Sequence, residues 1–178
     1  MIKNDIQATI NNKLQVLIGA EMCNAGRAVG LLWFLFTQKR DIPSQEANEF
    51  IQELKLHVQC AWRITQGNKI LVASSDRFYP KGDPYKDIEE FDWTLPFINR
   101  CDERVALLFS NEKHKNWKVL SARADHVGGF ALRFNRGRRL QVFPDDSLGE
   151  EYWRFFGDSS NQEHFVVTGN GIFGYSCE

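Results

Sequence analysis

The chain has 178 residues, of which 43% are hydrophobic and 25% are charged, a composition typical of a folded globular protein. Its 22 basic and 23 acidic residues give a net charge of −1, so the chain as a whole does not favour nucleic acid as a partner. No run reaches the roughly 20 apolar residues of a membrane span, and the first residues do not resemble a signal peptide. We therefore expect a single cytoplasmic domain, residues 1–178, with no membrane segment.

The first half of the chain reads as strands. The expected elements, in chain order, are a strand at 14–18, an apolar strand at 30–37, a charged insert at 38–53 with one helical turn near 44–50, a strand at 54–65, and a strand at 69–74. The segment 54–65 is the clearest, because six alternate residues, from Leu54 to Ile64, are apolar. Gln66-Gly67-Asn68 supplies the turn of a hairpin.

The middle of the chain is expected to hold a loop and one helix. Residues 76–94 contain two prolines, a glycine and mixed charges, a pattern that indicates irregular backbone. From 95 to 111, apolar residues recur at spacings of three and four, with Thr94 as the expected N-cap. These features predict one long helix at 95–111.

The second half is expected to repeat the first. The matched segments are Gly30 onward with Gly128 onward, Leu56-His57-Val58 with Leu140-Gln141-Val142, Trp62-Arg63 with Trp153-Arg154, 69–74 with 164–169, and 14–17 with 117–120. A repeated unit indicates an internal duplication. The glycine-rich tail after it, 169–178, is expected to fray.

The predicted fold is therefore α+β. Two pseudo-symmetric four-strand units, at about 14–76 and 117–171, would form a mainly antiparallel, strongly curved sheet, with the helix at 95–111 between them. A two-sheet sandwich is the alternative.

Catalytic and metal sites are not expected. The four cysteines, 23, 60, 101 and 177, form no Cys-x-x-Cys pair, and we expect them to be reduced. The four histidines lack the local spacing of zinc ligands. No nucleophile elbow or phosphate-binding loop is present, and the glycines at 169–174 precede no helix. We assign no catalytic residue, metal or cofactor.

Acidic clusters are the first candidates for a binding surface. Asp145, Asp146 and Glu150 lie in one turn, and a second cluster lies in the loop 83–92, near exposed aromatic residues such as Tyr79. These groups could dock a basic partner, although solvated loops are the commoner outcome.

The repeated Trp-Arg pairs are a second candidate. Strand alternation puts Trp62 and Trp153 in the core and leaves Arg63 and Arg154 on the surface. Together with Asp76 and Asp145, these arginines could line a small-molecule or hydrolase site in the concave face of the sheet. A basic cluster at 133–139 (Arg133, Arg136, Arg138 and Arg139) is expected to form local ion pairs rather than to bind nucleic acid.

Residues 130–156 carry a resemblance. The run from Leu132 to Phe143, the acidic turn and Glu151-Tyr152-Trp153-Arg154-Phe155 resemble small bacterial domains, some of which look like immunity proteins. That resemblance implies a protein that binds and neutralises a partner toxin. The preferred hypothesis is a non-enzymatic protein-binding domain, and a homodimer formed through a sheet edge or the strand 30–36 is compatible with it.

Overall fold

The structure of the chain, a computed structural model, describes residues 5–40, 50–83, 85, 91–110, 116–157 and 164–175. Apart from short 3-10 turns, its elements are α1 (Ile6–Leu14), β1 (Glu21–Ala28), β2 (Leu31–Arg40), β3 (Phe50–Val58), β4 (Ala61–Gln66), β5 (Lys69–Ala73), α2 (Arg100–Phe109), β6 (Val119–Ala124), β7 (Phe130–Phe134), β8 (Arg138–Phe143), β9 (Glu151–Gly157), β10 (His164–Thr168) and β11 (Gly171–Tyr175). The described part is α+β and mainly antiparallel, as predicted. The helical turn expected near 44–50 lies outside the described residues, apart from its last position, which begins β3.

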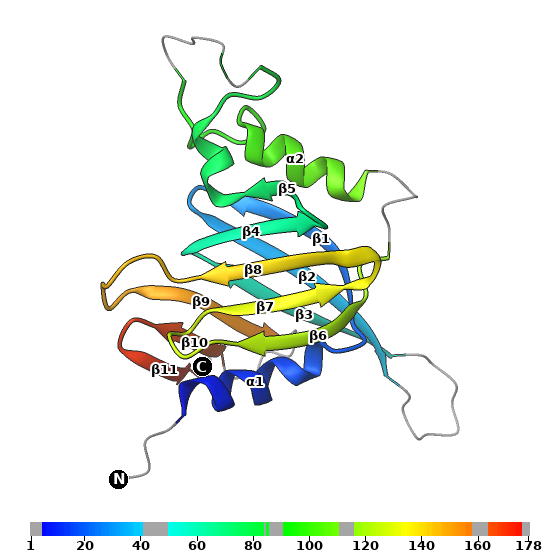
Figure 1. Cartoon of the computed structure of the whole chain (residues 1–178), viewed down its shortest axis with the longest axis vertical. Helices are drawn as coiled ribbons and strands as arrows, with labels where there is room; N and C mark the ends of the chain where they lie inside the picture. The colour runs from blue at the N-terminus through cyan, green and yellow to red at the C-terminus, as the bar shows by residue number, and fades with distance from the viewer. Residues whose placement is uncertain are drawn as a thin grey trace.

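The strands form two separate sheets, so the prediction of one continuous, strongly curved sheet is wrong. Sheet A has the order β1-β2-β3-β9-β10-β11, and sheet B has the order β5-β4-β8-β7-β6. The two sheets lie face to face, with sheet B in front in Figure 1. The alternative, a two-sheet sandwich, describes the fold. Period-two burial does not separate these architectures, because a strand in either one has a single face toward the core.

The two halves follow equivalent paths through the sheets. β1, β2 and β3 lie side by side in sheet A, after which β4 and β5 join sheet B. β6, β7 and β8 lie side by side in sheet B, after which β9 and β10 join sheet A. Each crossing strand pairs with the third strand of the other half, β4 with β8 and β9 with β3. Each sheet therefore combines three strands from one half with two from the other, and β11 extends sheet A.

The strand predicted at 54–65 is two strands, because the chain changes sheets in its middle. β3 ends at Val58 in sheet A, and β4 begins at Ala61 in sheet B. The alternate apolar residues are all buried, as predicted. A chain that crosses the sandwich keeps the same side toward the interior, so the alternation continues through the crossing.

Two tryptophans at corresponding positions span the interior. Trp62 of sheet B meets Phe34 of sheet A edge to face, with ring centroids 6.0 Å apart. Trp153 of sheet A meets Phe130 of sheet B in the same way at 4.8 Å. Both tryptophans are buried, so the prediction that they are core anchors is confirmed.

Helix α1 covers one open side of the sandwich. Its side chains bond to the edge strand β6: Gln7 Nε2 donates to the Ala124 carbonyl at 2.8 Å, and Asn11 Oδ1 accepts from the Ala124 amide at 2.8 Å. Helix α2 packs on β1 and β5 at the opposite side (Figure 1). Both helices thus protect strand edges that would otherwise expose unpaired backbone groups.

The first predicted strand, 14–18, is wrong. Leu14 ends α1, and residues Gln15–Leu17 form a 3-10 turn. The helix begins after Asp5, whose side chain accepts from the Ala8 amide, and it buries Ile10 and Leu14. Apolar residues four positions apart mark one face of a helix, and that longer pattern decides the structure here. The proposed match between 14–17 and 117–120 therefore fails at the level of secondary structure.

The long helix predicted at 95–111 is shorter, because its N-terminus is displaced. Thr94 donates to Asp92 instead of capping a helix, and Phe97 has φ 64°. The helix begins after Asn99, whose side chain accepts from the Asp102 amide at 2.9 Å. A left-handed residue cannot continue a right-handed helix, so α2 starts beyond Phe97.

Two strands were not predicted. β1 carries a bulge between Met22 and Asn24, which interrupts the alternation of its side chains. β11 lies in the tail that we expected to fray, and it pairs with β10 over all five of its residues. The last three residues, 176–178, lie outside the described part of the chain.

Candidate functional site

The structure does not bring together the four residues proposed for a concave pocket. Arg63 lies on the outer face of sheet B, and Arg154 lies on the outer face of sheet A. The two inner faces pack on each other through buried apolar side chains. The Asp76 and Asp145 carboxylates instead accept hydrogen bonds from the Ala73 and Ala61 amides.

Asp76 stabilises the 3-10 turn Ser74–Phe78. Its carboxylate accepts from the Ala73 amide at 2.8 Å and forms an ion pair with Arg100 at 3.3 Å. This links the end of β5 to the start of α2. Tyr79 follows the turn, with its side chain 46% exposed and its carbonyl bonded to the Arg100 amide.

The acidic turn after β8 is exposed, and its two aspartates organise the local backbone. Asp145 accepts from the Ala61 amide at 3.0 Å, which fixes the crossing into β4. Asp146 accepts from the Leu148 amide at 2.9 Å. Glu150 is exposed. A docking role for these carboxylates remains a prediction, and most of the second acidic cluster, at 83–92, lies outside the described residues.

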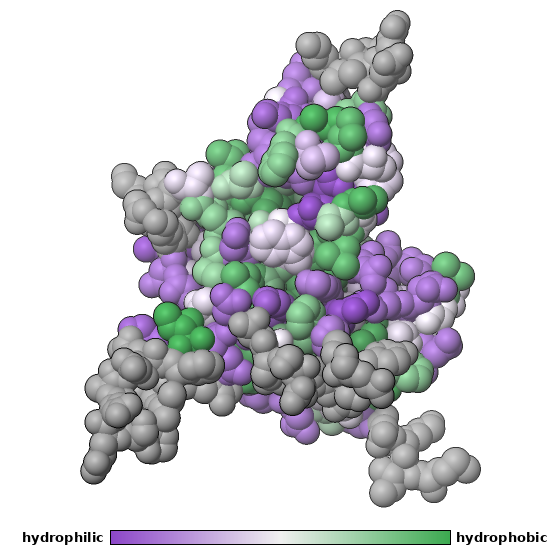
Figure 2. All heavy atoms as spheres, turned by 180° about the vertical axis from the view of Figure 1, so that it is seen from behind, coloured by the Kyte–Doolittle hydropathy of each residue, from purple (hydrophilic) through white to green (hydrophobic). Residues whose placement is uncertain are grey.

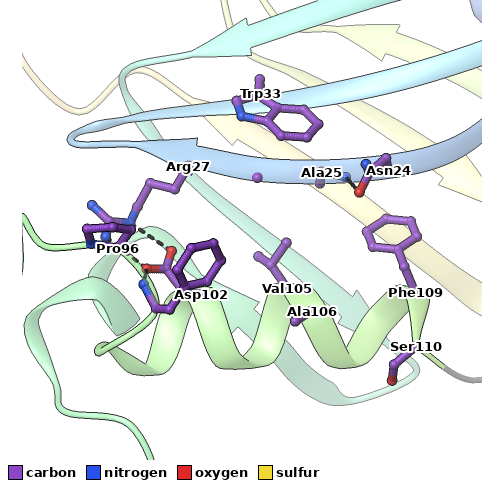
Figure 3. Close-up of a pocket in the computed structure, with 12 residues that line it drawn as sticks. Asn24, Ala25, Arg27, Trp33, Pro96, Asp102, Val105, Ala106, Phe109 and Ser110 are labelled. Atoms are coloured by element: carbon purple, nitrogen blue, oxygen red, sulfur yellow. Dashed lines mark hydrogen bonds and ion pairs between the residues drawn. The ribbon is translucent and has the colours of Figure 1, made fainter.

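A cleft of about 480 Å³ lies between α2 and the β1 edge of sheet A (Figure 3). Three aromatic side chains line it: Trp33 from β2, Phe97 from the segment before α2, and Phe109 from the end of α2. Trp33 lies over Gly26 of β1, where a Cβ would stand 2.3 Å from the indole ring. Glycine at position 26 is therefore needed for this placement. Sequence reasoning missed the cleft, because β1 was not predicted.

A buried ion pair forms the charged end of the cleft (Figure 3). Arg27 binds Asp102 through two hydrogen bonds of 2.9 Å, and the side chains are 4% and 9% exposed. The hydrogen bonds that Arg27 donates to Asp102 raise the pKa of Arg27, which stays cationic. Asp102 also accepts from the Phe97 amide and from Asn99 Nδ2. Both charges thus fasten the segment before α2 to β1, and the cleft presents mainly apolar surface to a ligand.

Four arginines share the outer face of sheet B, which we name the arginine face: Arg63, Arg123, Arg133 and Arg139. Arg133 and Arg139 are directly opposite each other in the β7–β8 register. Among the described residues, none of the four forms an ion pair with a carboxylate. The expectation of local ion pairs is therefore wrong for Arg133 and Arg139.

The arginine face is basic, although the net charge of the whole chain is −1. The five strands of sheet B contain no Asp or Glu and six basic residues, of which Arg138 points inward. The rest of the chain holds the other 16 basic residues and all 23 acidic ones. Arg63, Lys69 and Arg139 also line a hollow of about 290 Å³ on this face. An overall charge near zero thus conceals a strongly positive surface.

The outer face of sheet A has a different character. Seen from this side, Figure 2 shows apolar side chains gathered over the middle of the molecule. Trp33 and Leu35 of β2 point outward and are half-buried. The ring of Phe156 in β9 lies between two histidines, and its centroid is 4.9 Å from that of His57 and 4.3 Å from that of His164. β2 is an inner strand of this sheet, so dimer pairing through it would use its outward side chains rather than its backbone.

The described thiols are free and mostly shielded. Cys60 and Cys101 are buried, which raises the pKa of each to about 12, and Cys23 is exposed. Both buried thiols are therefore protonated near neutral pH and are poor nucleophiles. No three histidine, cysteine or acidic side chains of the described residues gather into a group that could hold a metal ion. Neither described helix has the length and apolar character needed to cross a membrane.

Comparison with known proteins adds no relative. No family model, no curated protein and no solved structure matches the chain. The function of the chain must therefore be inferred from the surfaces of its fold.

Proposed function

We propose that this chain is a non-enzymatic protein-binding domain that recognises an acidic protein surface through the arginine face. The observation that carries the proposal is the Arg133–Arg139 pair. These like charges are direct cross-strand neighbours, and no carboxylate of the described residues pairs with either one.

Stability alone does not account for this arrangement. Like charges placed directly opposite in a sheet are destabilising, and a single acidic residue nearby would compensate them. The sheet carries no such residue in any of its strands. An acidic partner supplies the missing charge, and charge complementarity of this kind accelerates association.

A protein partner fits the face better than a nucleic acid. Exposed apolar side chains, Ile70 and Phe143, lie among its cations, and Arg63 rests over the ring of Phe143 at 5.6 Å. Arginine and aromatic residues are the types enriched at protein interfaces. An immunity-type inhibitor of a toxin is one kind of protein that meets this description.

Binding to a defined acidic polymer tests the proposal. We expect poly-L-glutamate to bind the protein at roughly 0.15 M salt, where screening removes the weaker long-range attraction. Arg133→Glu with Arg139→Glu should weaken that binding about tenfold or more, because attraction becomes repulsion. The control, Lys13→Glu with Lys81→Glu, makes the same change in net charge away from the face.

Two results would overturn the proposal. One is equal loss of binding in both double variants, which would show that only net charge matters. The other is selective binding of a DNA duplex of equal charge, with poly-L-glutamate inactive at the same salt concentration. That result would make the face a nucleic-acid surface.

The cleft of Figure 3 favours a second candidate, the binding of a small apolar molecule. Its volume of about 480 Å³ falls within the usual range of ligand sites, and its aromatic lining suits a planar apolar ligand. A screen read by indole fluorescence tests it, with Trp33→Phe as the variant that should remove the signal. Hits that keep their signal in this variant bind elsewhere.

The chain is also proposed to be one domain that arose by duplication. Equivalent strand paths in the two halves support this origin, and the continuous apolar core supports a single folding unit. A single cooperative unfolding transition, followed by both fluorescence and circular dichroism, is the expected result. Two separate transitions would contradict it.

A further inference from the structure

A smaller cavity lies between α2 and the inner side of sheet B. Its volume is about 190 Å³. It is lined by Gln66, Leu71, Arg104, Leu107, Leu108, Trp117 and Arg138. Leu107 is 54% exposed, so the cavity reaches the surface beside α2. We name it the Arg104 cavity.

Two residues that line the Arg104 cavity each carry a buried donor with no acceptor among the described residues. Trp117 is 1% exposed, and its Nε1 makes no hydrogen bond. Arg104 Nε is likewise buried without a partner. Buried donors are almost always satisfied in folded proteins, so two of them around one cavity need an explanation.

A buried cation lies beside these donors. Arg138 is 2% exposed, and its guanidinium rests over the Trp117 ring at 4.2 Å. Burial, and to a lesser extent the neighbouring Arg136, lowers the pKa of Arg138, so its surroundings disfavour the charge it carries. Two arginines and a tryptophan therefore line a space that an acceptor could fill.

We propose that the Arg104 cavity binds a small oxyanion group, a carboxylate or a phosphate, which accepts hydrogen bonds from Trp117 and Arg104. Such a group satisfies both orphan donors, and its charge strengthens the hydrogen bond from Arg104. The small volume of the Arg104 cavity limits the buried part of the ligand to one such group. The cavity lies on the inner side of sheet B, so the inference does not depend on the function proposed for the arginine face.

Thermal unfolding in phosphate tests the inference. Sodium phosphate should raise the melting temperature of the protein relative to sodium chloride at equal ionic strength, because a ligand of the folded state stabilises it. Calorimetric titration with phosphate should show that Arg104→Gln weakens binding about tenfold or more. Lys81→Gln, at an exposed position away from both the cavity and the arginine face, should leave phosphate binding unchanged. A second series in sodium acetate distinguishes a site for both oxyanions from one specific for phosphate.

Trp117→Phe keeps the test decisive if Arg104→Gln does not fold. It removes the N–H and retains an aromatic ring under Arg138, and it should also weaken phosphate binding. The inference is overturned if neither phosphate nor acetate stabilises the protein more than chloride does. It is equally overturned if Lys81→Gln, rather than the two cavity variants, removes the effect.

Discussion

Arg63 and Arg154 follow corresponding buried tryptophans in the two halves of the chain, yet their surroundings differ. Arg154, on sheet A, binds the Glu151 carboxylate through hydrogen bonds of 2.7 and 2.6 Å. Arg63, on sheet B, donates to the neutral side chain of Gln141 at 2.9 Å. Equivalent topology has thus left one arginine neutralised within the chain and the other with its charge uncompensated.

The same contrast holds for the charged residues of the two sheets as a whole. On sheet A, Arg27 pairs with Asp102 at 2.9 Å, and Lys55 lies 3.8 Å from Glu53. On sheet B, the arginine face has no carboxylate partner among the described residues. Internal pairing uses the charges of sheet A for structure, whereas those of sheet B stay available to another molecule.

Breaking the ion pair between Arg27 and Asp102 should have the largest effect on stability. Asp102→Ala leaves Arg27 buried without its counter-ion, and we expect a loss of about 3–5 kcal/mol in the free energy of unfolding. Chemical denaturation measures it. Arg123→Ala on the arginine face is the control and should stay within about 0.5 kcal/mol of the wild type. Similar losses in both variants would remove the distinction between the two groups of arginines.

Replacing the corresponding tryptophans, Trp62 and Trp153, should have effects of intermediate size on stability. Trp153 Nε1 donates to the buried Gly128 carbonyl at 2.7 Å, and Trp62 has no such bond in the described structure. Trp153→Phe should therefore cost about 1–3 kcal/mol more than Trp62→Phe in the free energy of unfolding, because it leaves a buried carbonyl unsatisfied. Equal costs would mean that ring packing alone decides both positions.

Relieving repulsion on the arginine face should slightly stabilise the protein. Arg133→Gln removes the like charge opposite Arg139, and we expect a gain of about 0.2–1 kcal/mol that shrinks as salt is added. Glu151→Gln, which breaks the pair with Arg154 on sheet A, should change stability in the opposite direction. Denaturation at low and high salt measures both. A loss of stability in Arg133→Gln would show that the charge is engaged within the fold.

The smallest expected effect is the contribution of His57, on the outer face of sheet A, to the pH dependence of stability. Burial, and secondly the charge of Arg154, lower the pKa of His57 below its ordinary 6.5. The folded chain therefore binds this proton less readily than the unfolded chain, and the free energy of unfolding falls as pH drops below about 6.5. His57→Gln should reduce that acid-side slope in denaturation measured as a function of pH, and an unchanged slope would contradict this assignment.

The sequence predicts the strands with clear alternation, but not their division between two sheets. Alternation from Leu54 to Ile64 reports which side is buried, and it stays unbroken where the chain crosses from β3 to β4. β1 escaped prediction because its bulge disrupts the pattern. The displaced start of α2 depends on the left-handed backbone at Phe97, for which a phenylalanine gives no signal.

Part of the arginine face can be predicted from the sequence. Arg133 and Arg139 were recognised as a basic cluster, but the absence of acidic neighbours depends on strand pairing. Arg123 and Arg63 join them across the sheet, from segments far apart in the chain. The acidic turn at Asp145 was identified by composition alone, and its backbone hydrogen bonds appear only in the folded structure.

An NMR titration of the protein with poly-L-glutamate tests the arginine face most directly. Backbone amide signals of β4, β7 and β8 should shift at roughly 0.15 M salt, while those of β3 and β9 in sheet A stay in place. Shifts confined to sheet A, or to the turn from Asp145 to Glu150, would contradict the assignment of the arginine face as the binding surface.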